Sequence, residues 1–266
     1  MINQPSELQV GPYTFHSRLF VGTGKYQTLA VMKAAVIASQ TELVTVALRR
    51  VDLNHPDEPT ILDYLPDTVK VLPNTAGCHT AAEACQVAAL SKASGIGTLI
   101  KLEIIGDNAL LWPDPVETLK ATEQLVADGY TVMVYTSPDP VQAVYLARAG
   151  AHAIMPLGSP IGSGQGVWDY SALQRIKERV EVPVVLDAGI GGPADAALAM
   201  ESGADAVLVN TAIALAGDPV RMAHAMKMAV EAGREGYLSG RMAPKTLAQP
   251  SSPSQGIVEF AAKRLS

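Results

Sequence analysis

The feature that most constrains the fold is a regular alternation of short apolar segments with Ala- and Leu-rich segments along the 266-residue chain. The apolar segments are rich in β-branched residues and nearly continuous, which is typical of parallel strands covered on both faces. Strands are therefore predicted at 18–21, 43–48, 69–72, 98–105, 130–135, 153–157, 182–186 and 206–209.

Helices are predicted between these strands, at 28–39, 80–91, 115–127, 140–149, 169–179, 193–202 and 219–232. Several begin at or near a proline, which is favoured in the first helical turn. Three are expected to end at a glycine, namely Gly150, Gly203 and Gly233. The connection around 59–65 has the weakest helical pattern.

About eight strand–helix units in a chain of this length predict an α/β protein with a closed (β/α)8 TIM barrel. An open doubly wound sheet with an accessory domain is the alternative, but the even spacing and the absence of a linker favour one barrel domain over 1–266. Alternation around Gly11-Pro12 predicts an N-terminal hairpin within about residues 1–17 that closes the bottom of the barrel. A flexible C-terminal tail is expected over about 236–266, which is rich in Ser, Pro and basic residues.

Composition excludes several classes of function. The formal charge of −6 disfavours non-specific nucleic-acid binding, and no apolar stretch approaches the roughly 20 residues of a membrane span. Met1 to Val10 lacks the pattern of a secretory signal. Cys78 and Cys85 would stand roughly 10 Å apart on a helix, too far for a disulfide, so a reduced, cytoplasmic protein is expected. The five histidines lack ligand spacing, and no metal is predicted.

The strand predicted at 98–105 carries two charged residues in an apolar run. Strand side chains alternate between faces, so Lys101 and Glu103 are expected to point into the barrel near its C-terminal end, opposite to Ile100 and Leu102. Burial lowers the pKa of a lysine and suits it to attack a carbonyl as a Schiff-base nucleophile, with Glu103 as a proton shuttle. An ionised Glu103 would act in the opposite direction, and the residues alone do not decide which effect is larger.

The alternative is a buried Lys–Glu pair that only supports packing, although such pairs are often no more stabilising than apolar residues. Ionisable groups in buried sites cluster at functional positions, which favours the catalytic interpretation.

Two consecutive strand ends carry residues suited to an anion. Asp187 ends the strand at 182–186 and precedes a Gly-rich turn that includes Gly189, while Asn210 and Thr211 follow the last strand. The loops after strands seven and eight are the usual phosphate site of TIM barrels. The Gly-rich loop at 158–166 is interpreted as a lid or a substrate-lining loop.

Other polar residues at strand ends have ordinary interpretations. Gly22-Thr23-Gly24 lacks the third glycine of a dinucleotide fingerprint, and Lys25 is not followed by the Ser or Thr of a P-loop. His79 is interpreted as a polar loop residue.

Long motifs of the chain closely resemble the thiazole synthase (ThiG) family of bacterial thiamin biosynthesis. The motifs are 19–26, 46–50, 72–78, Lys101-Leu102-Glu103 with Gly106-Asp107, 155–162, 187–191, 210–213, 232–234 and 251–253.

The resemblance implies condensation of 1-deoxy-D-xylulose 5-phosphate, dehydroglycine (2-iminoacetate) and sulfur from the C-terminal thiocarboxylate of a ubiquitin-like carrier protein. The product would be a thiazole phosphate carboxylate. In family terms, Lys101 forms an imine with the sugar ketone, and Glu103 and Asp187 serve as the acid–base pair. The sugar phosphate would be bound by residues at five positions, Gly162, Ala188, Gly189, Asn210 and Thr211.

The resemblance also implies a cytoplasmic homo-oligomer, with a tetramer as the expected size, and no metal or organic cofactor. The sulfur carrier is an expected partner, as is, in some organisms, the enzyme that produces dehydroglycine. Two alternatives remain from the residues alone: a class I aldolase acting on a sugar phosphate, which would need no sulfur donor, and a non-catalytic phosphate-binding scaffold.

Overall fold

A computed structural model describes residues 7–48 and 60–251. Predictions that concern 1–6, 49–59 and 252–266 lie outside the described residues, including the motif at Arg49-Arg50, the motif at Ser252-Pro253 and the last part of the expected tail.

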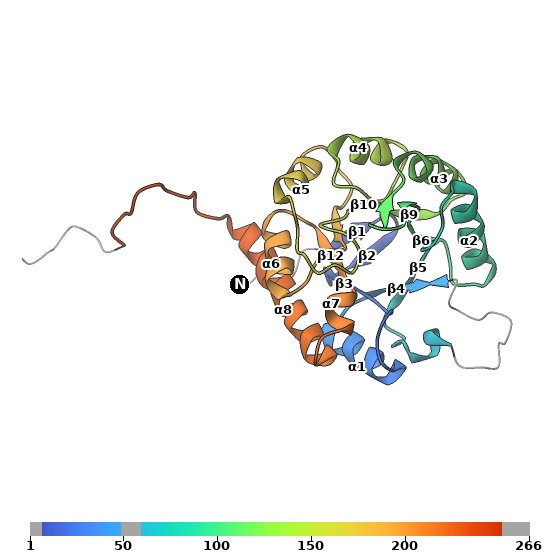
Figure 1. Ribbon diagram of the computed structural model, residues 1–266, viewed down its shortest axis with the longest axis horizontal. Coiled ribbons are helices and arrows are strands. Elements are labelled where there is room, and N and C mark those ends of the chain that lie inside the picture. Colours follow the sequence, from blue (N-terminus) through green and yellow to red (C-terminus); the bar gives the residue numbers. More distant parts are fainter. Residues whose placement is uncertain (1–6, 49–59, 252–266) are drawn as a thin grey trace, which may run out of the picture.

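Eight parallel strands form the centre of the molecule, surrounded by helices (Figure 1). They are β3 (Leu19–Gly22), β4 (Leu43–Ala47), β5 (Lys70–Asn74), β6 (Leu99–Leu102), β9 (Thr131–Thr136), β10 (Ala153–Pro156), β11 (Val185–Asp187) and β12 (Ala206–Val209). Their order is β10-β9-β6-β5-β4-β3-β12-β11, and bridges from Ile154 to Val184 and from Leu157 to Asp187 join the two ends of this sheet. The predicted (β/α)8 TIM barrel is therefore confirmed, and the open-sheet alternative is wrong because the sheet closes.

The seven predicted helices are all present. They are α1 (Leu29–Ser39), α2 (Ala81–Ala93), α3 (Pro115–Ala127), α4 (Pro140–Arg148), α5 (Tyr170–Lys177), α6 (Pro193–Glu201) and α8 (Pro219–Ser239). Three of them, α3, α4 and α8, begin with an Asp-Pro pair whose aspartate accepts hydrogen bonds from the first-turn N–H groups. This pair combines a good N-cap with the fixed φ of proline at the first helical position, which explains why the helix starts were predictable.

Several details of the elements differ from the prediction or add to it. The strand expected over 98–105 ends at Leu102, and Ile105 instead begins a short hairpin of β7 (Ile105–Asp107) and β8 (Trp112–Pro113). A one-turn helix, α7 (Thr211–Ala214), follows β12, and the connection around 59–65 contains only the 3-10 helix η2 (Ile61–Tyr64).

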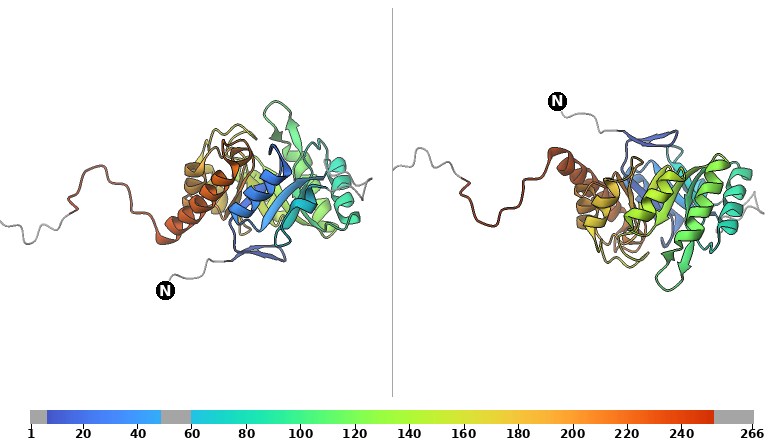
Figure 2. Two further views of the ribbon diagram at one scale, coloured as in Figure 1. Left: turned by 90° about the horizontal axis from the view of Figure 1, so that it is seen from below. Right: turned by 90° about the horizontal axis from the view of Figure 1, so that it is seen from above.

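Helix α8 extends to Ser239, so the helix end expected at 232, before Gly233, is wrong, and the segment without helix or strand begins at Gly240 and not at about 236. A Cβ at Gly233 would lie 2.3 Å from the carbonyl oxygen of Ala197 in α6. Gly233 therefore allows two helices to approach closely and does not end one. Residues 240–251 contain no helix or strand and lead away from the barrel (Figures 1 and 2).

The two hairpins lie at opposite ends of the barrel (Figure 2). The hairpin of β1 (Leu8–Val10) and β2 (Tyr13–Phe15) covers the N-terminal ends of the strands, whereas β7–β8 rises from the C-terminal end. Phe15 packs edge-on against Phe20 inside the barrel, with ring centroids 5.4 Å apart. The barrel interior below the site is filled by one apolar cluster that includes Leu8, Val10, Phe15, Phe20, Leu43, Leu72, Met133 and Met155.

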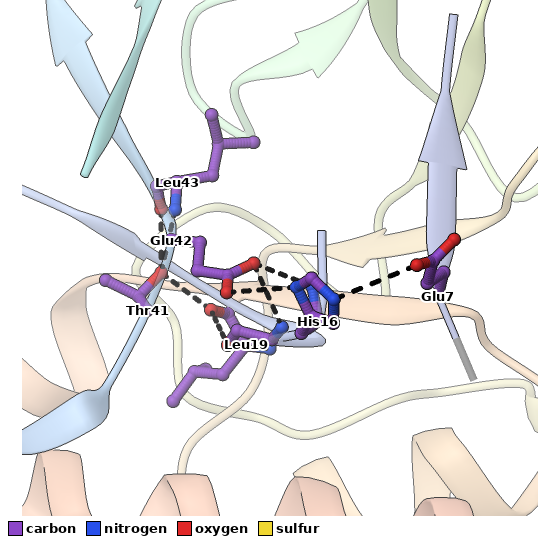
Figure 3. A network of polar contacts seen from close by, with 7 residues as sticks. Glu7, His16, Leu19, Thr41, Glu42 and Leu43 are labelled. Atoms are coloured by element: carbon purple, nitrogen blue, oxygen red, sulfur yellow. Dashed lines mark hydrogen bonds and ion pairs between the residues drawn. The ribbon is translucent and has the colours of Figure 1, made fainter. Parts of the chain in front are cut away.

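Glu42 ties the N-terminal hairpin to the barrel (Figure 3). Its carboxylate accepts hydrogen bonds from the backbone N–H groups of His16 (2.6 Å) and Ser17 (3.3 Å), and it lies 3.5 Å from the His16 ring. The Thr41 hydroxyl lies 2.7 Å from the carbonyl oxygen of Leu19, which joins the start of β4 to β3. With one end closed in this way, a ligand can enter the barrel from the other end.

Among the described residues, no helix is long and apolar enough to cross a membrane.

Candidate active site

A cavity of about 500 Å³ opens at the C-terminal end of the barrel strands. All eight residues predicted from the sequence line it: Lys101, Glu103, Asp187, Gly162, Ala188, Gly189, Asn210 and Thr211. Because catalytic residues of TIM barrels lie at this end, the position is that of an active site.

Three ionisable groups meet at the floor of this cavity. Lys101 Nζ lies 2.5 Å from Asp187 Oδ2 and 3.6 Å from Glu103 Oε2. All three residues are buried: Lys101 is 5% exposed, Asp187 is 4% exposed and Glu103 is 8% exposed. The alternation predicted for the strand is correct, since Lys101 and Glu103 reach the interior while Ile100, Leu102 and Ile104 pack in the layer between strands and helices.

The charges of this group favour an ammonium on Lys101. Burial acts to lower the pKa of Lys101, but the attraction and hydrogen bonds of Asp187 and Glu103 outweigh it, and the pKa is raised. Burial raises the pKa of Glu103 against the opposing effect of Lys101, and the charge of Asp187 raises it further. The resting site therefore contains a Lys101 ammonium that contacts Asp187, beside a Glu103 whose pKa lies above its ordinary value.

Tyr135, near the end of β9, lies beside the lysine. Lys101 Nζ lies 5.5 Å from the centroid of this fully buried ring, within the range of a cation–π contact. The Tyr135 hydroxyl donates to the carbonyl oxygen of Leu111 (3.2 Å), so the same residue contacts the β7–β8 hairpin. Burial, together with the charges of Asp187 and Glu103, raises the pKa of Tyr135, which keeps the phenol neutral.

Thr75 holds Glu103 in place through the backbone. The Glu103 N–H donates to Thr75 Oγ1 (2.8 Å), and the Thr75 hydroxyl donates to the Glu103 carbonyl (2.7 Å). Glu103 lies just beyond the end of β6. The fully buried Thr75 hydroxyl therefore takes the place of the backbone hydrogen bonds that a neighbouring strand would supply. Thr75 was not predicted as a site residue, because its role depends on a contact between two strands.

Two Gly-rich segments pack together on one side of the cavity. Ala188 and Gly189 have φ of +64° and +87°, so the chain turns sharply after Asp187. The Gly189 carbonyl accepts from the N–H of Gly166 (2.8 Å), and a Cβ at Gly189 would lie 2.4 Å from Ser159 Oγ. The loop at 158–166 is therefore packed against this turn, and it lines the cavity at Ile161 and Gly162.

Asn210 joins the end of β12 to the loop that follows β3. Its side-chain amide donates to the carbonyl oxygens of Gly24 (2.9 Å) and Gly22 (3.3 Å). A Cβ at Gly22 would lie 2.5 Å from Asn210 Cβ, so this approach requires glycine. The side chain of Asn210 is thus engaged with a neighbouring loop, and Thr211 presents its hydroxyl near Gly162.

Further polar residues line the cavity, and three of them are Asn74, His79 and Lys25. Asn74 ends β5 and donates to Thr45 Oγ1 (3.0 Å), His79 Nδ1 lies 2.9 Å from the Ile105 carbonyl oxygen, and Lys25 lies in the loop after β3. Their positions at the C-terminal ends of strands are the signal by which the sequence could have indicated them. His79 was interpreted as a polar loop residue and Lys25 was only excluded as a P-loop lysine, so the sequence analysis missed their place in the cavity.

The model of the thiazole biosynthesis protein ThiG matches residues 9–253 of the chain. The chain belongs to the ThiG family. Its relatives include thiazole synthases of Anoxybacillus flavithermus, with 57% identity, and of Geobacillus thermodenitrificans, with 55% identity. Each match covers 94% of this chain and 98% of the relative.

A solved structure contains a chain with a similar fold. The Amycolatopsis orientalis BexX/CysO complex contains a chain with 32% identity and a TM-score of 0.80, and the match covers 91% of this chain and 98% of that chain. This ThiG family member is therefore an enzyme of thiazole synthesis. The two alternatives left by the residues alone, a class I aldolase and a non-catalytic scaffold, are wrong.

Proposed function

We propose that this chain builds the thiazole ring from 1-deoxy-D-xylulose 5-phosphate, dehydroglycine and the sulfur of a carrier-protein thiocarboxylate, through an imine on Lys101. The observation that carries the proposal is a buried lysine that faces the cavity between two carboxylates, 2.5 Å from Asp187 and 3.6 Å from Glu103. A buried lysine with carboxylates as proton acceptors is suited to attack a ketone.

The first step needs a neutral amine, whereas the raised pKa of Lys101 favours its ammonium form. Asp187 accepts the proton of Lys101, and the amine then attacks the ketone carbon of the sugar. A proton moves from the nitrogen of this adduct to its oxygen and forms a hydroxyl. Glu103, whose raised pKa favours its acid form, then protonates the hydroxyl, which leaves as water when the protonated imine forms. The two carboxyl groups then move protons during sugar rearrangement, sulfur addition and the later loss of water.

The phosphate of the sugar is placed at the rim formed by Gly162, Ala188, Gly189, Asn210 and Thr211. The support is their shared position around one side of the cavity, with glycines that let a ligand approach the backbone and the Thr211 hydroxyl beside them. Lys101 lies deeper in the cavity than this rim, so a sugar whose ketone end enters the cavity first would bring its ketone to Lys101 and leave its phosphate at the rim.

The partners follow from the same reaction. BexX was solved in complex with CysO, which supports a carrier protein that docks at the open end of the barrel. We also propose a cytoplasmic homo-oligomer, with a tetramer as the expected size, that in some organisms receives dehydroglycine from the enzyme that makes it. No metal or organic cofactor enters the proposed steps.

Trapping with borohydride tests this proposal. Incubation with 1-deoxy-D-xylulose 5-phosphate and borohydride should add the mass of the reduced sugar phosphate to the peptide that contains Lys101, as measured by mass spectrometry. Lys101→Arg, which keeps a charge, should give no adduct, whereas Lys120→Arg, at an exposed lysine on α3, should react as the wild type does. An adduct on another lysine, or no adduct at all, would overturn the mechanism.

A further inference from the structure

Lys25 lies over the rim of the cavity, beside residues placed at the sugar phosphate. It belongs to the loop between β3 and α1 and is an exposed side chain. The Lys25 Nζ atom lies 3.3 Å from the point that a Cβ on Gly162 would occupy, and Thr211 Oγ1 lies 3.6 Å from the same point. The Lys25 amino group and the Thr211 hydroxyl thus both lie near a backbone position that has no side chain.

The backbone directs Lys25 toward this place. Its φ of +70° is uncommon for a residue other than glycine, and such conformations persist where the surroundings hold them. The loop is held just before Lys25, because Asn210 donates to the carbonyl oxygen of Gly24 and the Thr23 hydroxyl donates to that of Thr45 (2.9 Å). After it, the half-buried Tyr26 packs against the helix layer.

Among the described residues that line the cavity, Lys25 and Lys101 are the two lysines that could face a bound phosphate. A phosphate monoester carries a charge of about −1.5 to −2 at neutral pH. Lys101 is already paired with Asp187 and lies beside Glu103, so this group of three residues adds no net positive charge. Within residues 7–48 and 60–251, no ion pair of Lys25 is present, and the described lining contains no other lysine besides these two. The net charge of −6 gives no general attraction for an anion.

We propose that Lys25 binds the phosphate of the substrate and makes the site selective for a phosphorylated sugar over its neutral analogue. Lys25 acts as a binding and specificity residue, since its ammonium contacts the phosphate and not the ketone. The inference rests on the proposed function in one respect, namely that the sugar phosphate reacts at Lys101.

The test compares two sugars, 1-deoxy-D-xylulose 5-phosphate and 1-deoxy-D-xylulose, by borohydride trapping at Lys101 over a range of concentrations. Lys25→Gln should raise the half-saturating concentration of the phosphorylated sugar by about 10- to 100-fold, the effect of losing one charge-assisted contact. The value for the neutral sugar should remain the same. Lys25→Arg should retain most of the selectivity, and Lys33→Gln, which removes an exposed charge from α1, should behave as the wild type does.

Lys25→Asn serves as a second variant, because asparagine tolerates a positive φ and removes the charge without straining the loop. An unchanged half-saturation for the phosphorylated sugar in both neutral variants would overturn the proposal, as would an equal loss for both sugars, which would indicate a structural role.

Titration of inorganic phosphate into wild type and Lys25→Gln separates this proposal from the wider one. If phosphate binds the wild type but not Lys25→Gln, and neither protein forms an adduct on Lys101, the phosphate-binding role of Lys25 is supported and the imine mechanism is overturned. Phosphate that binds both proteins equally would overturn the role of Lys25, whatever the trapping at Lys101 shows.

Discussion

Lys101 Nζ and Asp187 Oδ2 lie 2.5 Å apart, although their strands, β6 and β11, are separated around the barrel by β9 and β10. The pair therefore crosses the barrel interior. Because Asp187 raises the pKa of Lys101, the resting lysine is held as an ammonium, and the site must move one proton before the amine can react. The contact between Lys101 and Asp187 forms only when the barrel closes, and it sets the protonation state of the reacting lysine.

Replacing Asp187 by Asn should separate imine formation from the steps that follow. The substitution removes the charge that raises the pKa of Lys101, so the adduct should still form with borohydride. Turnover should fall by about 10²- to 10⁴-fold, the usual contribution of a positioned acid or base. Product formation and adduct yield, measured on the same samples, check this. Full turnover by Asp187→Asn would remove Asp187 from the acid–base pair.

Replacing Glu103 by Gln should change how stability depends on pH. The folded protein raises the pKa of Glu103 above its unfolded value of about 4.3, so the native state binds more protons above that pH, and stability from this group falls as pH rises through the folded pKa. Glutamine cannot titrate, so as pH rises above about 4.3 the free energy of unfolding of Glu103→Gln should fall less, or rise more, than that of the wild type.

Urea unfolding at several pH values measures this difference, with Glu123→Gln, an exposed residue on α3, as the control. Parallel pH profiles for wild type and Glu103→Gln would show that the folded state does not favour the protonated form of Glu103.

Thr75→Val should reduce both stability and kcat. Valine has nearly the shape of threonine but leaves the buried N–H of Glu103 without its acceptor, at a cost of about 1–3 kcal/mol. Thr75→Ser retains the hydroxyl and should recover most of kcat. A displaced Glu103 should also alter the pH profile of kcat. If Thr75→Val is less stable but keeps the wild-type kcat and pH profile, Thr75 has a structural role only.

Gly22→Ala should destabilise the protein by about 1–3 kcal/mol, the usual cost of overpacking. The new Cβ would meet Asn210 at 2.5 Å and push it from the loop that carries Lys25, so the affinity for the sugar phosphate should fall as well. Gly217→Ala is the matched control, since no atom lies within 4 Å of its new Cβ. Chemical unfolding and sugar-phosphate titration of both variants check the prediction, and equal stabilities of the two would contradict it.

Predictions from the sequence succeeded where a local pattern determines the structure. The inward direction of Lys101 and Glu103 follows from strand alternation, and the start of α3 follows from Asp114 and Pro115. The end of α8 was missed because a glycine can end a helix or allow close packing within one. Only the carbonyl of Ala197, brought near by α6, shows which applies to Gly233.

Eight buried strands, the helices between them and an inward-facing lysine could all be predicted from the residues alone, because these features depend on periodicity and on neighbouring residues. The tertiary structure decided the contact of Lys101 with Asp187, the support of Glu103 by Thr75 and the place of Lys25 beside Gly162. Those contacts join residues far apart in the chain, and their distances exist only once the barrel closes. The direction of the pKa of Lys101 belongs with them, since it depends on whether burial or the nearby carboxylates have the larger effect.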